Sequence, residues 1–232
     1  MIVRNPALEL QVPIGKRQYP SMEPKVLVAT RRHPRWKRFM DVILTLLLLP
    51  LLTPLMVLIA VYIRSVSPGP SLFVQSRVGH GGHVFWIYKF RTMHVSWSSR
   101  DEKHRRYVAD RALSDGPILK PWYRNELIPG GRLLRKLSLD ELPQLFNVLR
   151  GNMSLVGPRP DLLQLEDYSP HQARRFEVMP GMTGLWQVSG KNSLSFDQMI
   201  ALDLDYIDRM SVWMDLVILF RTIDFLINSR NE

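Results

Sequence analysis

A long apolar segment without charge constrains the fold of this chain more than any other sequence feature. Residues 42–63 read VILTLLLLPLLTPLMVLIAVYI. As a straight helix, these roughly 22 residues would reach about 33 Å, which is enough to cross a bilayer core of about 30 Å. The segment starts too far from Met1 and is too long for a secretory signal peptide, and no small-residue cleavage site follows nearby. It therefore predicts a membrane helix.

Two prolines, Pro50 and Pro54, lie in the middle of this segment. Each removes a backbone donor and crowds the carbonyl one turn earlier, at a cost of about 3 kcal/mol in an unsupported helix interior, so we expect a sharp bend. In a re-entrant helix, two arms of about ten residues would each descend roughly 15–18 Å, and Thr53 could satisfy backbone groups freed at the bend.

Basic side chains on both sides of the segment bear on its topology. By the positive-inside rule they favour both helix ends on the cytoplasmic face, and a re-entrant helix is the simplest geometry with that property. They are Arg31, Arg32, Arg35, Lys37 and Arg38 before the segment, and Arg64, Arg77, Lys89 and Arg91 after it. Spanning helices tolerate prolines when neighbouring groups compensate, so the residues alone leave re-entrant and spanning helices equally open.

The whole chain is strongly basic, with 31 Lys and Arg against 21 Asp and Glu and a net charge of +10. This charge indicates an anionic partner, which could be nucleic acid, an anionic lipid surface or a phosphorylated small substrate. The basic residues are spread among loops that contain Gly and Pro and are not aligned on one helix. We therefore expect no nucleic-acid partner, and a membrane-tethered nucleic-acid binder stands as the alternative from another class. The absence of Cys excludes a disulfide framework, a thiolate metal site and a thiol nucleophile.

The pattern divides the chain into three parts: an irregular basic arm at 1–34, a membrane helix at 35–65 and a cytosolic domain at 66–232. The arm contains several prolines and shows no sustained hydrophobic period. The fold class that we expect is α+β and mainly helical, with short strands and with amphipathic helices at the membrane interface.

Local patterns in the third part predict its elements. Runs rich in β-formers at 72–75 and 84–90 flank a glycine turn and predict a hairpin. Helical patterns occupy 97–111, 131–150, 196–209 and 211–228. Ser138 and Glu141 match a capping box, and Gly151 is suited to end the second of these helices. The last helix is amphipathic, and an interfacial position and a core-packed position are equally open for it.

An adjacent carboxylate pair, Asp140 and Glu141, lies close to several basic residues in this basic chain. At the second and third positions of a helix each would gain about 0.3–1 kcal/mol from the helix dipole, so helix capping is the simpler explanation. The surrounding cations favour another one, because guanidinium and ammonium groups in loops suit the oxygens of a diphosphate. These cations are Lys89, Arg91, Arg132, Arg135, Lys136, Arg159 and Lys191. Two carboxylates there could hold one Mg²⁺, and a carboxylate can attack a phosphoryl group to give an acyl phosphate.

Seven strings spread over most of the chain carry a family resemblance. They are KRFMD (37–41), SPGP (67–70), FVQSRVG (73–79), KFRTM (89–93), LRKLSLDELPQLFNVLRGNMSLVGPRP (134–160), PGMTGLWQVSGKN (180–192) and LDYIDRMSVWMDLVILFRTI (204–223). With them, the chain resembles the bacterial sugar transferases of the monotopic phosphoglycosyl transferase family. It is most similar to the short form that transfers hexose-1-phosphate in the first membrane step of exopolysaccharide synthesis.

The resemblance implies a reaction and a set of site residues. In the family, the Asp of the LSLDELPQL core attacks the β-phosphate of a nucleotide-diphosphate sugar. The nucleophile implied here is Asp140, with Glu141 and Mg²⁺ assisting and with both carboxylates as metal ligands. The donor would be a UDP-hexose such as UDP-galactose or UDP-glucose. UMP would leave, and undecaprenyl phosphate would then accept the sugar-1-phosphate in a ping-pong reaction. The substrate- and phosphate-binding positions implied are Lys89, Arg91, Arg135, Arg159, Gln187 and Lys191.

The resemblance also implies a membrane topology. Family members have a re-entrant helix broken at a Ser-Pro pair, and Thr53-Pro54 falls at that position. Both termini and the active site would then lie at the cytoplasmic leaflet of the bacterial inner membrane. Two features depart from the family: Lys191 stands where Arg is usual, which loses bidentate geometry, and 115–132 lacks an Asp-Pro-Arg-like stretch, for which Arg124 could substitute. A homodimer, an association with later glycosyltransferases and an inactive scaffold are left open.

Overall fold

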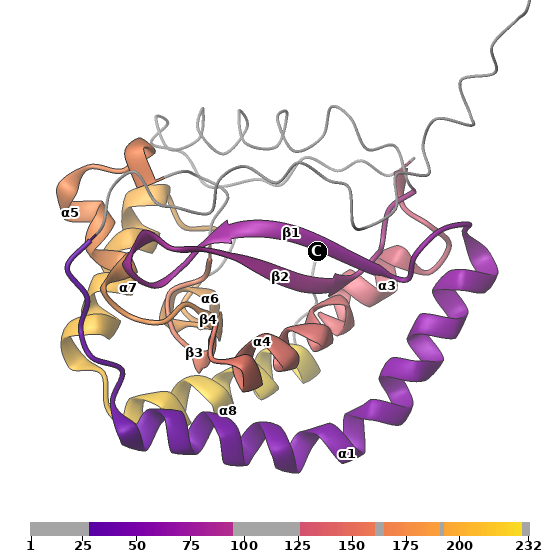
Figure 1. Cartoon of the computed structure of the whole chain (residues 1–232), viewed down its shortest axis with the longest axis horizontal. Coiled ribbons are helices and arrows are strands. Elements are labelled where there is room, and N and C mark those ends of the chain that lie inside the picture. The colour runs from indigo at the N-terminus through magenta and orange to yellow at the C-terminus, as the bar shows by residue number, and fades with distance from the viewer. Residues whose placement is uncertain (1–27, 95–125, 161–164, 191–192, 229–232) are drawn as a thin grey trace, which may run out of the picture.

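The computed structural model describes residues 28–94, 126–160, 165–190 and 193–228. Figure 1 shows a mainly helical protein in which one long helix, α1 (Arg35–Val66), follows two edges of the remaining elements. The described residues also form two small sheets, β1–β2 and β3–β4, in agreement with the expected fold class of helices with few short strands. The predicted helix at 97–111, Arg124 and the arm at 1–27 lie outside the described residues.

Helix α1 bends but is not broken. It continues through Pro50 and Pro54, and Figure 1 shows the bend that these prolines predict. The Thr53 hydroxyl donates to the carbonyl of Leu49 at 2.7 Å. The carbonyl that Pro54 deprives of its helical donor is the next one, that of Pro50. Our expectation for Thr53 is therefore corrected, because its hydroxyl reinforces the turn beside the freed group and does not satisfy the group itself.

The two halves of α1 pack against different parts of the same domain. In the first half, Lys37, Asp41 and Thr45 are buried, and Asp41 Oδ1 accepts a hydrogen bond from the amide of Leu155 at 2.9 Å. The second half contributes to a small hydrophobic core that contains Met56, Ile59, Ile63, Phe90, Ile128 and Leu134. Both ends of this helix are therefore seated on one body of protein.

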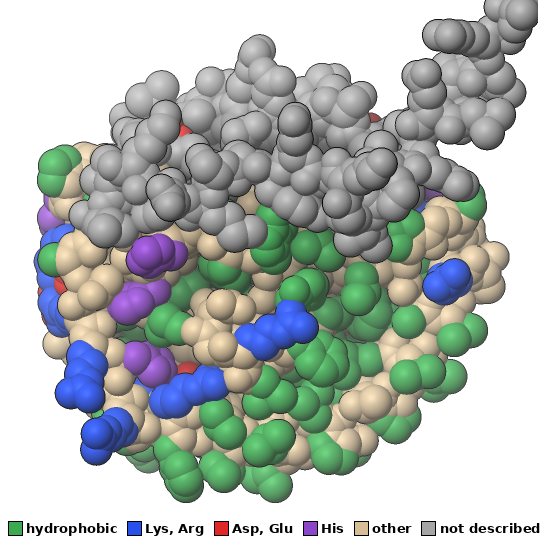
Figure 2. Space-filling model, in the orientation of Figure 1, with side chains coloured by type: hydrophobic (Ala, Val, Ile, Leu, Met, Phe, Trp, Pro, Cys, Tyr) green, Lys and Arg blue, Asp and Glu red, His purple; other side chains and the backbone are tan. Residues whose placement is uncertain are grey.

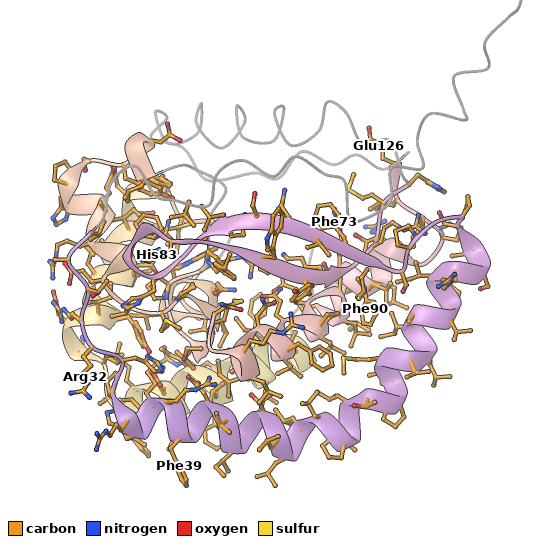
Figure 3. The ribbon with its side chains drawn as sticks, viewed as in Figure 1. Arg32, Phe39, Phe73, His83, Phe90 and Glu126 are labelled. Carbon is orange, nitrogen blue, oxygen red and sulfur yellow. The ribbon has the colours of Figure 1, made fainter. Side chains whose placement is uncertain are left out.

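Away from these contacts, α1 exposes large apolar side chains. Phe39 points away from the domain (Figure 3), and hydrophobic side chains line the edge that α1 forms (Figure 2). The side chains more than half exposed are Phe39, Leu46, Leu47, Leu51, Val57, Leu58 and Val61. Among the described helices, α1 alone is long and apolar enough to cross a membrane. An exposed apolar surface of this size marks a contact with lipid or with another protein.

The predicted hairpin is confirmed. Strands β1 (Leu72–Val78) and β2 (Val84–Phe90) pair antiparallel, and β1 is longer than the predicted run at 72–75. The connecting turn η3 (His80–Gly82) contains Gly81 at φ 66° and Gly82 at φ 87°, which is backbone that favours glycine. The hairpin crosses the domain in front of the helices in Figure 1.

Short elements follow the hairpin. They are α3 (Gly131–Lys136), η5 (Leu139–Gln144), α4 (Leu145–Arg150), β3 (Ser154–Val156), η6 (Leu165–Asp167), α5 (Pro170–Ala173), η7 (Arg174–Glu177), β4 (Gly181–Thr183) and α6 (Leu185–Val188). Strands β3 and β4 pair in parallel at very close range. A Cβ on Gly181 would lie 2.1 Å from the amide nitrogen of Gly157, so these two backbones can meet only because both residues lack a side chain. The contact joins Gly157 of the GPRP string to Gly181 of the PGMTG string, which explains why each string has a glycine at that position.

The predicted capping box at Ser138 is wrong. Ser138 has φ 53° and makes no side-chain cap, and the segment that follows it, η5, is a 3₁₀ helix with Pro143 inside it. A capping side chain needs an extended backbone at the cap residue, which Ser138 does not have. The predicted end at Gly151 is confirmed, since this residue has φ 81° at the end of α4.

The last two helices agree with the predicted ranges. Helix α7 (Phe196–Arg209) begins with a capping box in which the hydroxyl of Ser195 accepts a hydrogen bond from the amide of Gln198. Helix α8 (Val212–Asn228) buries Asp215 and Ile218 and exposes Trp213 to 74% of its possible surface. One face of α8 is thus packed in the core, and the opposite one carries exposed apolar side chains.

Candidate active site

Three elements far apart in sequence meet at the carboxylate pair. Lys89 comes from β2, Asp140 and Glu141 come from η5, and Arg159 comes from the turn after β3. Glu141 Oε1 accepts a hydrogen bond from Lys89 Nζ at 3.0 Å, and Glu141 Oε2 accepts one from Arg159 Nη1 at 3.0 Å. Arg159 Nη2 also donates to Glu141 Oε1, so the guanidinium binds this carboxylate with both arms.

The backbone of these segments is fixed by proline and by strand pairing. Arg159 lies between Pro158 and Pro160, whose rings restrict their own φ and the conformation of the residue before each. The amide of Gly181 donates to the carbonyl of Pro158 at 2.9 Å, which ties the turn to β4. The guanidinium that binds Glu141 therefore extends from a rigid support.

Glu141 is held as an anion. Its side chain is 19% exposed, against 16% for Lys89 and 25% for Arg159. Burial alone would raise the pKa of the Glu141 carboxyl, but the charges and hydrogen bonds of Arg159 and Lys89 outweigh it and hold that pKa well below its usual range. Burial lowers the pKa of Lys89, an effect that the Glu141 charge opposes and that the Arg159 and Arg77 charges reinforce. Glu141 thus organises the cations and is poorly suited to accept a proton or to attack.

Asp140 has the opposite environment. Burial and the neighbouring Glu141 charge raise the pKa of the Asp140 carboxyl, against the opposing charges of Lys89, Arg135 and Arg159. Within the part of the chain that the structure describes, no hydrogen bond or ion pair reaches this carboxylate. Two adjacent carboxylates with pKa values pushed in opposite directions can divide two roles between them. Asp140 offers an oxygen that is available to a substrate and is more basic than that of an ordinary aspartate.

The other predicted cations occupy different positions. Arg135 Nε donates to Thr92 Oγ1 at 2.8 Å, and its charge acts on Asp140, so it belongs to the rim of this cluster. Arg91 is buried and donates to Ser67 Oγ, to the Ser67 carbonyl and to the Pro70 carbonyl. Its guanidinium therefore fastens the turn that follows α1.

Two further predicted residues lie apart from the cluster. Gln187 sits in α6, where its Nε2 is 3.4 Å from the carbonyl of Met182, and its buried Oε1 has no partner among the described residues. Lys191 is outside the described residues. Thr53 and Pro54 lie in the middle of α1.

Arg77 also belongs to this charged group, although the sequence pattern indicated it only as a basic residue that follows the apolar helix. It pairs with Phe85 in the hairpin register, and Phe85 lies four residues before Lys89 on β2. Side chains on one strand repeat every second residue, so Arg77 and Lys89 share a face of the hairpin. Arg77 Nη2 donates to Gln75 Oε1 at 2.7 Å on that same face. Arg77 lies beyond the predicted strand run at 72–75, so the sequence prediction did not place it on the hairpin.

The donor set can be compared with the needs of Mg²⁺. The described residues contain no group of three or more His, Cys, Asp or Glu side chains arranged to hold a metal. Mg²⁺ is commonly bound by one or two carboxylates together with substrate phosphates and water. The carboxylate of Asp140 fits as one protein ligand of such an ion, which a diphosphate substrate would complete, whereas both oxygens of Glu141 already accept hydrogen bonds from Lys89 and Arg159.

Comparison with known proteins gives one family. The family described as bacterial sugar transferase matches residues 32–229. The UDP-glucose:undecaprenyl-phosphate glucose-1-phosphate transferase of Caulobacter vibrioides is 42% identical over 217 residues, which cover 90% of this chain and 74% of the relative. The exopolysaccharide production protein ExoY of Sinorhizobium fredii is 38% identical, covering 84% of this chain and 87% of the relative. The undecaprenyl-phosphate galactose phosphotransferase of Salmonella typhimurium is 37% identical, covering 80% of this chain but 39% of the relative.

Proposed function

This chain belongs to the bacterial sugar transferase family, and from that premise we propose that it transfers a sugar-1-phosphate from a UDP-sugar to undecaprenyl phosphate. The observation that carries the proposal is the Asp140 carboxylate, which has no partner among the described residues and lies beside Lys89, Arg135 and Arg159. Relatives named for glucose and galactose transfer support a UDP-hexose as the donor. The relatives named exopolysaccharide production protein ExoY support a role in exopolysaccharide synthesis, in which the proposed transfer would be the first membrane step.

In the first half-reaction, an oxygen of Asp140 attacks the phosphorus that carries the sugar. The bond from that phosphorus to the bridging oxygen breaks, its electron pair stays with the leaving group, and UMP departs. The sugar phosphate remains on Asp140 as an acyl phosphate. Lys89, Arg135 and Arg159 offset the negative charge of the diphosphate, which would otherwise repel the attacking carboxylate. A bound Mg²⁺ would neutralise further charge on the phosphate oxygens.

In the second half-reaction, a phosphate oxygen of undecaprenyl phosphate attacks the same phosphorus. The bond to Asp140 breaks, the carboxylate is restored, and the product is a lipid-linked sugar diphosphate. Glu141 does not enter either bond change. Because Arg159 and Lys89 hold its pKa low, Glu141 stays charged, and its charge opposes the effect of burial on the pKa of Lys89 and keeps both cations in place through both half-reactions.

We also propose that α1 is a re-entrant helix at the cytoplasmic leaflet of the inner membrane. The support is its packing, because the buried side chains of its first half and those of its second half contact the same domain. A helix that crossed the bilayer would carry one of its ends away from a domain confined to one side. The exposed apolar side chains near the bend would enter the lipid.

A transfer assay tests the reaction. The full chain in nanodiscs is mixed with undecaprenyl phosphate, Mg²⁺ and a panel of UDP-hexoses labelled in the sugar, and label in the lipid phase is counted. We expect transfer from one donor, none with Asp140→Asn, and normal transfer with Asp205→Asn, which removes an exposed carboxylate from a surface ion pair with Arg209. Transfer that persists in Asp140→Asn would overturn the assignment of the nucleophile.

Omission of the lipid acceptor tests the covalent intermediate. In that condition the wild-type protein should release up to one equivalent of UMP and retain one equivalent of labelled sugar phosphate. Release of UMP only when the lipid is present would instead indicate a direct transfer, without a step on Asp140. An inactive scaffold would show neither reaction with any donor.

A further inference from the structure

A buried polar cluster joins α1 to the two C-terminal helices. It consists of Lys37 and Asp41 from α1, Tyr206 from α7 and Asp215 from α8, and we call it the α1–α8 cluster. Lys37 Nζ donates to Asp215 Oδ2 at 2.5 Å, and the Tyr206 hydroxyl donates to Asp215 Oδ1 at 2.8 Å. Lys37 is 1% exposed and Asp215 is fully buried. Neither half-reaction above uses any of these side chains.

Hydrophobic packing alone does not explain this cluster. Withdrawing an ammonium group and a carboxylate from water is costly, and well-packed apolar residues of similar volume commonly replace a buried ion pair without loss of stability. Burial raises the pKa of Asp215 and, more strongly, that of Tyr206, so the site is one in which charge is expensive. The presence of these buried polar groups must therefore be explained by the backbone segment that they hold in place.

The cluster holds strand β3. The Tyr206 hydroxyl lies 3.2 Å from the carbonyl oxygen of Val156, and Asp41 Oδ1 accepts from the amide of Leu155 at 2.9 Å. Asp41 of α1 and Tyr206 of α7 thus contact consecutive residues of a three-residue strand, Tyr206 through a hydroxyl for whose single proton Asp215 and Val156 compete. Arg159 follows Val156 by three residues, and its side chain binds Glu141 with both arms.

Another buried cation supports the same turn from its other side. Arg175 Nη2 donates to the carbonyl of Arg159 at 3.0 Å and pairs with Asp203 Oδ2 at 2.8 Å. The backbone around Arg159 is consequently fixed at both ends by buried charged groups. A guanidinium that must meet both oxygens of Glu141 depends on such support, because misplacement by about 1 Å in an active site can cost on the order of a hundredfold in rate.

We propose that Lys37, Tyr206 and Asp215 are positioning residues that fix β3 and thereby seat Arg159 on Glu141. This inference rests on the proposed transferase reaction. It assigns to the first turns of α1 a role in the chemistry in addition to their role in anchoring, because Lys37 reaches the strand that leads to Arg159 through Asp215 and Tyr206, and Asp41 binds that strand directly.

The test compares rates per active site in the full chain in nanodiscs. The amount of UMP released in the first turnover without lipid acceptor counts active sites, and the steady-state rate is divided by that number. Tyr206→Phe keeps the ring and removes only the hydroxyl, and we expect the rate per active site to fall about tenfold, with KM for the UDP-sugar changed less than twofold. Ser195→Ala removes a cap from the same helix α7 without touching β3 and should leave the rate per active site unchanged.

Coupling to Arg159 is measured in a double-mutant cycle. If Tyr206 acts through Arg159, Tyr206→Phe should reduce the rate per active site by less than twofold when Arg159→Lys is already present. Equal reductions in both backgrounds would overturn the proposal, as would a Tyr206→Phe protein that loses active sites but keeps its rate per site. If Tyr206→Phe does not fold, the double variant Lys37→Met with Asp215→Asn takes its place, because it removes both charges at nearly constant volume. An unchanged rate per active site in that double variant would also overturn the proposal. A wild-type protein without turnover would refute the proposed function first, which separates the two failures.

Discussion

Replacement of Glu141 by Gln should shift the whole pH–rate profile toward acid. Burial and the Glu141 charge raise the pKa of Asp140, and in the proposed reaction Asp140 must be ionised to attack, so activity should be lost as the pH falls through that pKa. Without the Glu141 charge the pKa of Asp140 falls, and the acid limb moves to lower pH. The same charge opposes the effect of burial on Lys89, so the pKa of Lys89 also falls and the alkaline limb follows.

The size of the rate loss follows from the contacts of Glu141. A hydrogen bond to a charged partner contributes about 1.5–3 kcal/mol, and Glu141 binds two cations, Lys89 and Arg159. Both cations retain some exposure and can recover part of this energy from water, so we take the lower end, about 3 kcal/mol for the two together. If that energy is expressed fully in the transition state, kcat/KM falls roughly a hundredfold.

The assay is UMP release over a range of pH, for the wild type, Glu141→Gln and Glu177→Gln. Glu177 is a matched control, because it also lies between two cations, Arg31 and Arg174, and its side chain is 16% exposed, but it is not in the cluster. Its variant should keep both limbs where they are. A shift of the Glu141→Gln profile toward alkaline pH, or an unchanged profile, would refute the assignment of opposite roles to the two carboxylates.

Three other predictions concern stability and topology. The pKa of Glu141 is lower in the folded state than in the unfolded state, so its contribution to stability is present above the ordinary Glu pKa and is lost as the pH falls through the lowered pKa. In denaturant unfolding from pH 6 to pH 3, the free energy of unfolding should therefore fall more steeply for the wild type than for Glu141→Gln. Gly181→Ala should prevent folding or cost more than about 3 kcal/mol, because its Cβ would lie 2.1 Å from the amide nitrogen of Gly157, whereas Ser189→Ala on an exposed position should change thermal stability little. Because the chain contains no Cys, single Arg35→Cys and Ser65→Cys variants can report the topology of α1. We expect a membrane-impermeant thiol reagent to label both variants in inverted membrane vesicles and neither in intact cells. Labelling of the two variants from opposite sides of the membrane would refute the re-entrant helix.

Elements with a strong local signal were predictable from sequence, and the assembly of the site was not. The hairpin, the end of α4 at Gly151 and the range of α7 follow from period, turn glycines and capping residues. The capping box at Ser138 failed because that residue has a positive φ and its side chain makes no cap hydrogen bond, neither of which the four-residue pattern specifies. No local pattern could place Arg159 against Glu141, since this contact depends on the pairing of β3 with β4.

Several of the basic residues before the apolar segment bind other groups of the protein, which weakens the topology prediction that rests on counting them. The positive-inside rule counts Lys37 and Arg38 as residues that face lipid head groups. In the structure Lys37 is buried against Asp215, and Arg38 donates to the carbonyls of Val148 and Leu149 at the end of α4. Arg31 is likewise bound to Glu177 and Asp208.

Of the five basic residues in this flank, Arg32 and Arg35 are therefore the exposed ones that remain for lipid phosphates. Two exposed charges are weak support for a topology under the positive-inside rule. The spacing of the buried residues on α1 is stronger evidence, because it identifies the part of the helix that packs against protein. Lys37, Asp41 and Thr45 recur every four residues and form one face of α1, as residues that pack against protein do. A polar face of this kind cannot lie in lipid, so the first turns of α1 belong to the domain, and in the proposed topology the membrane-facing part of the helix begins beyond them.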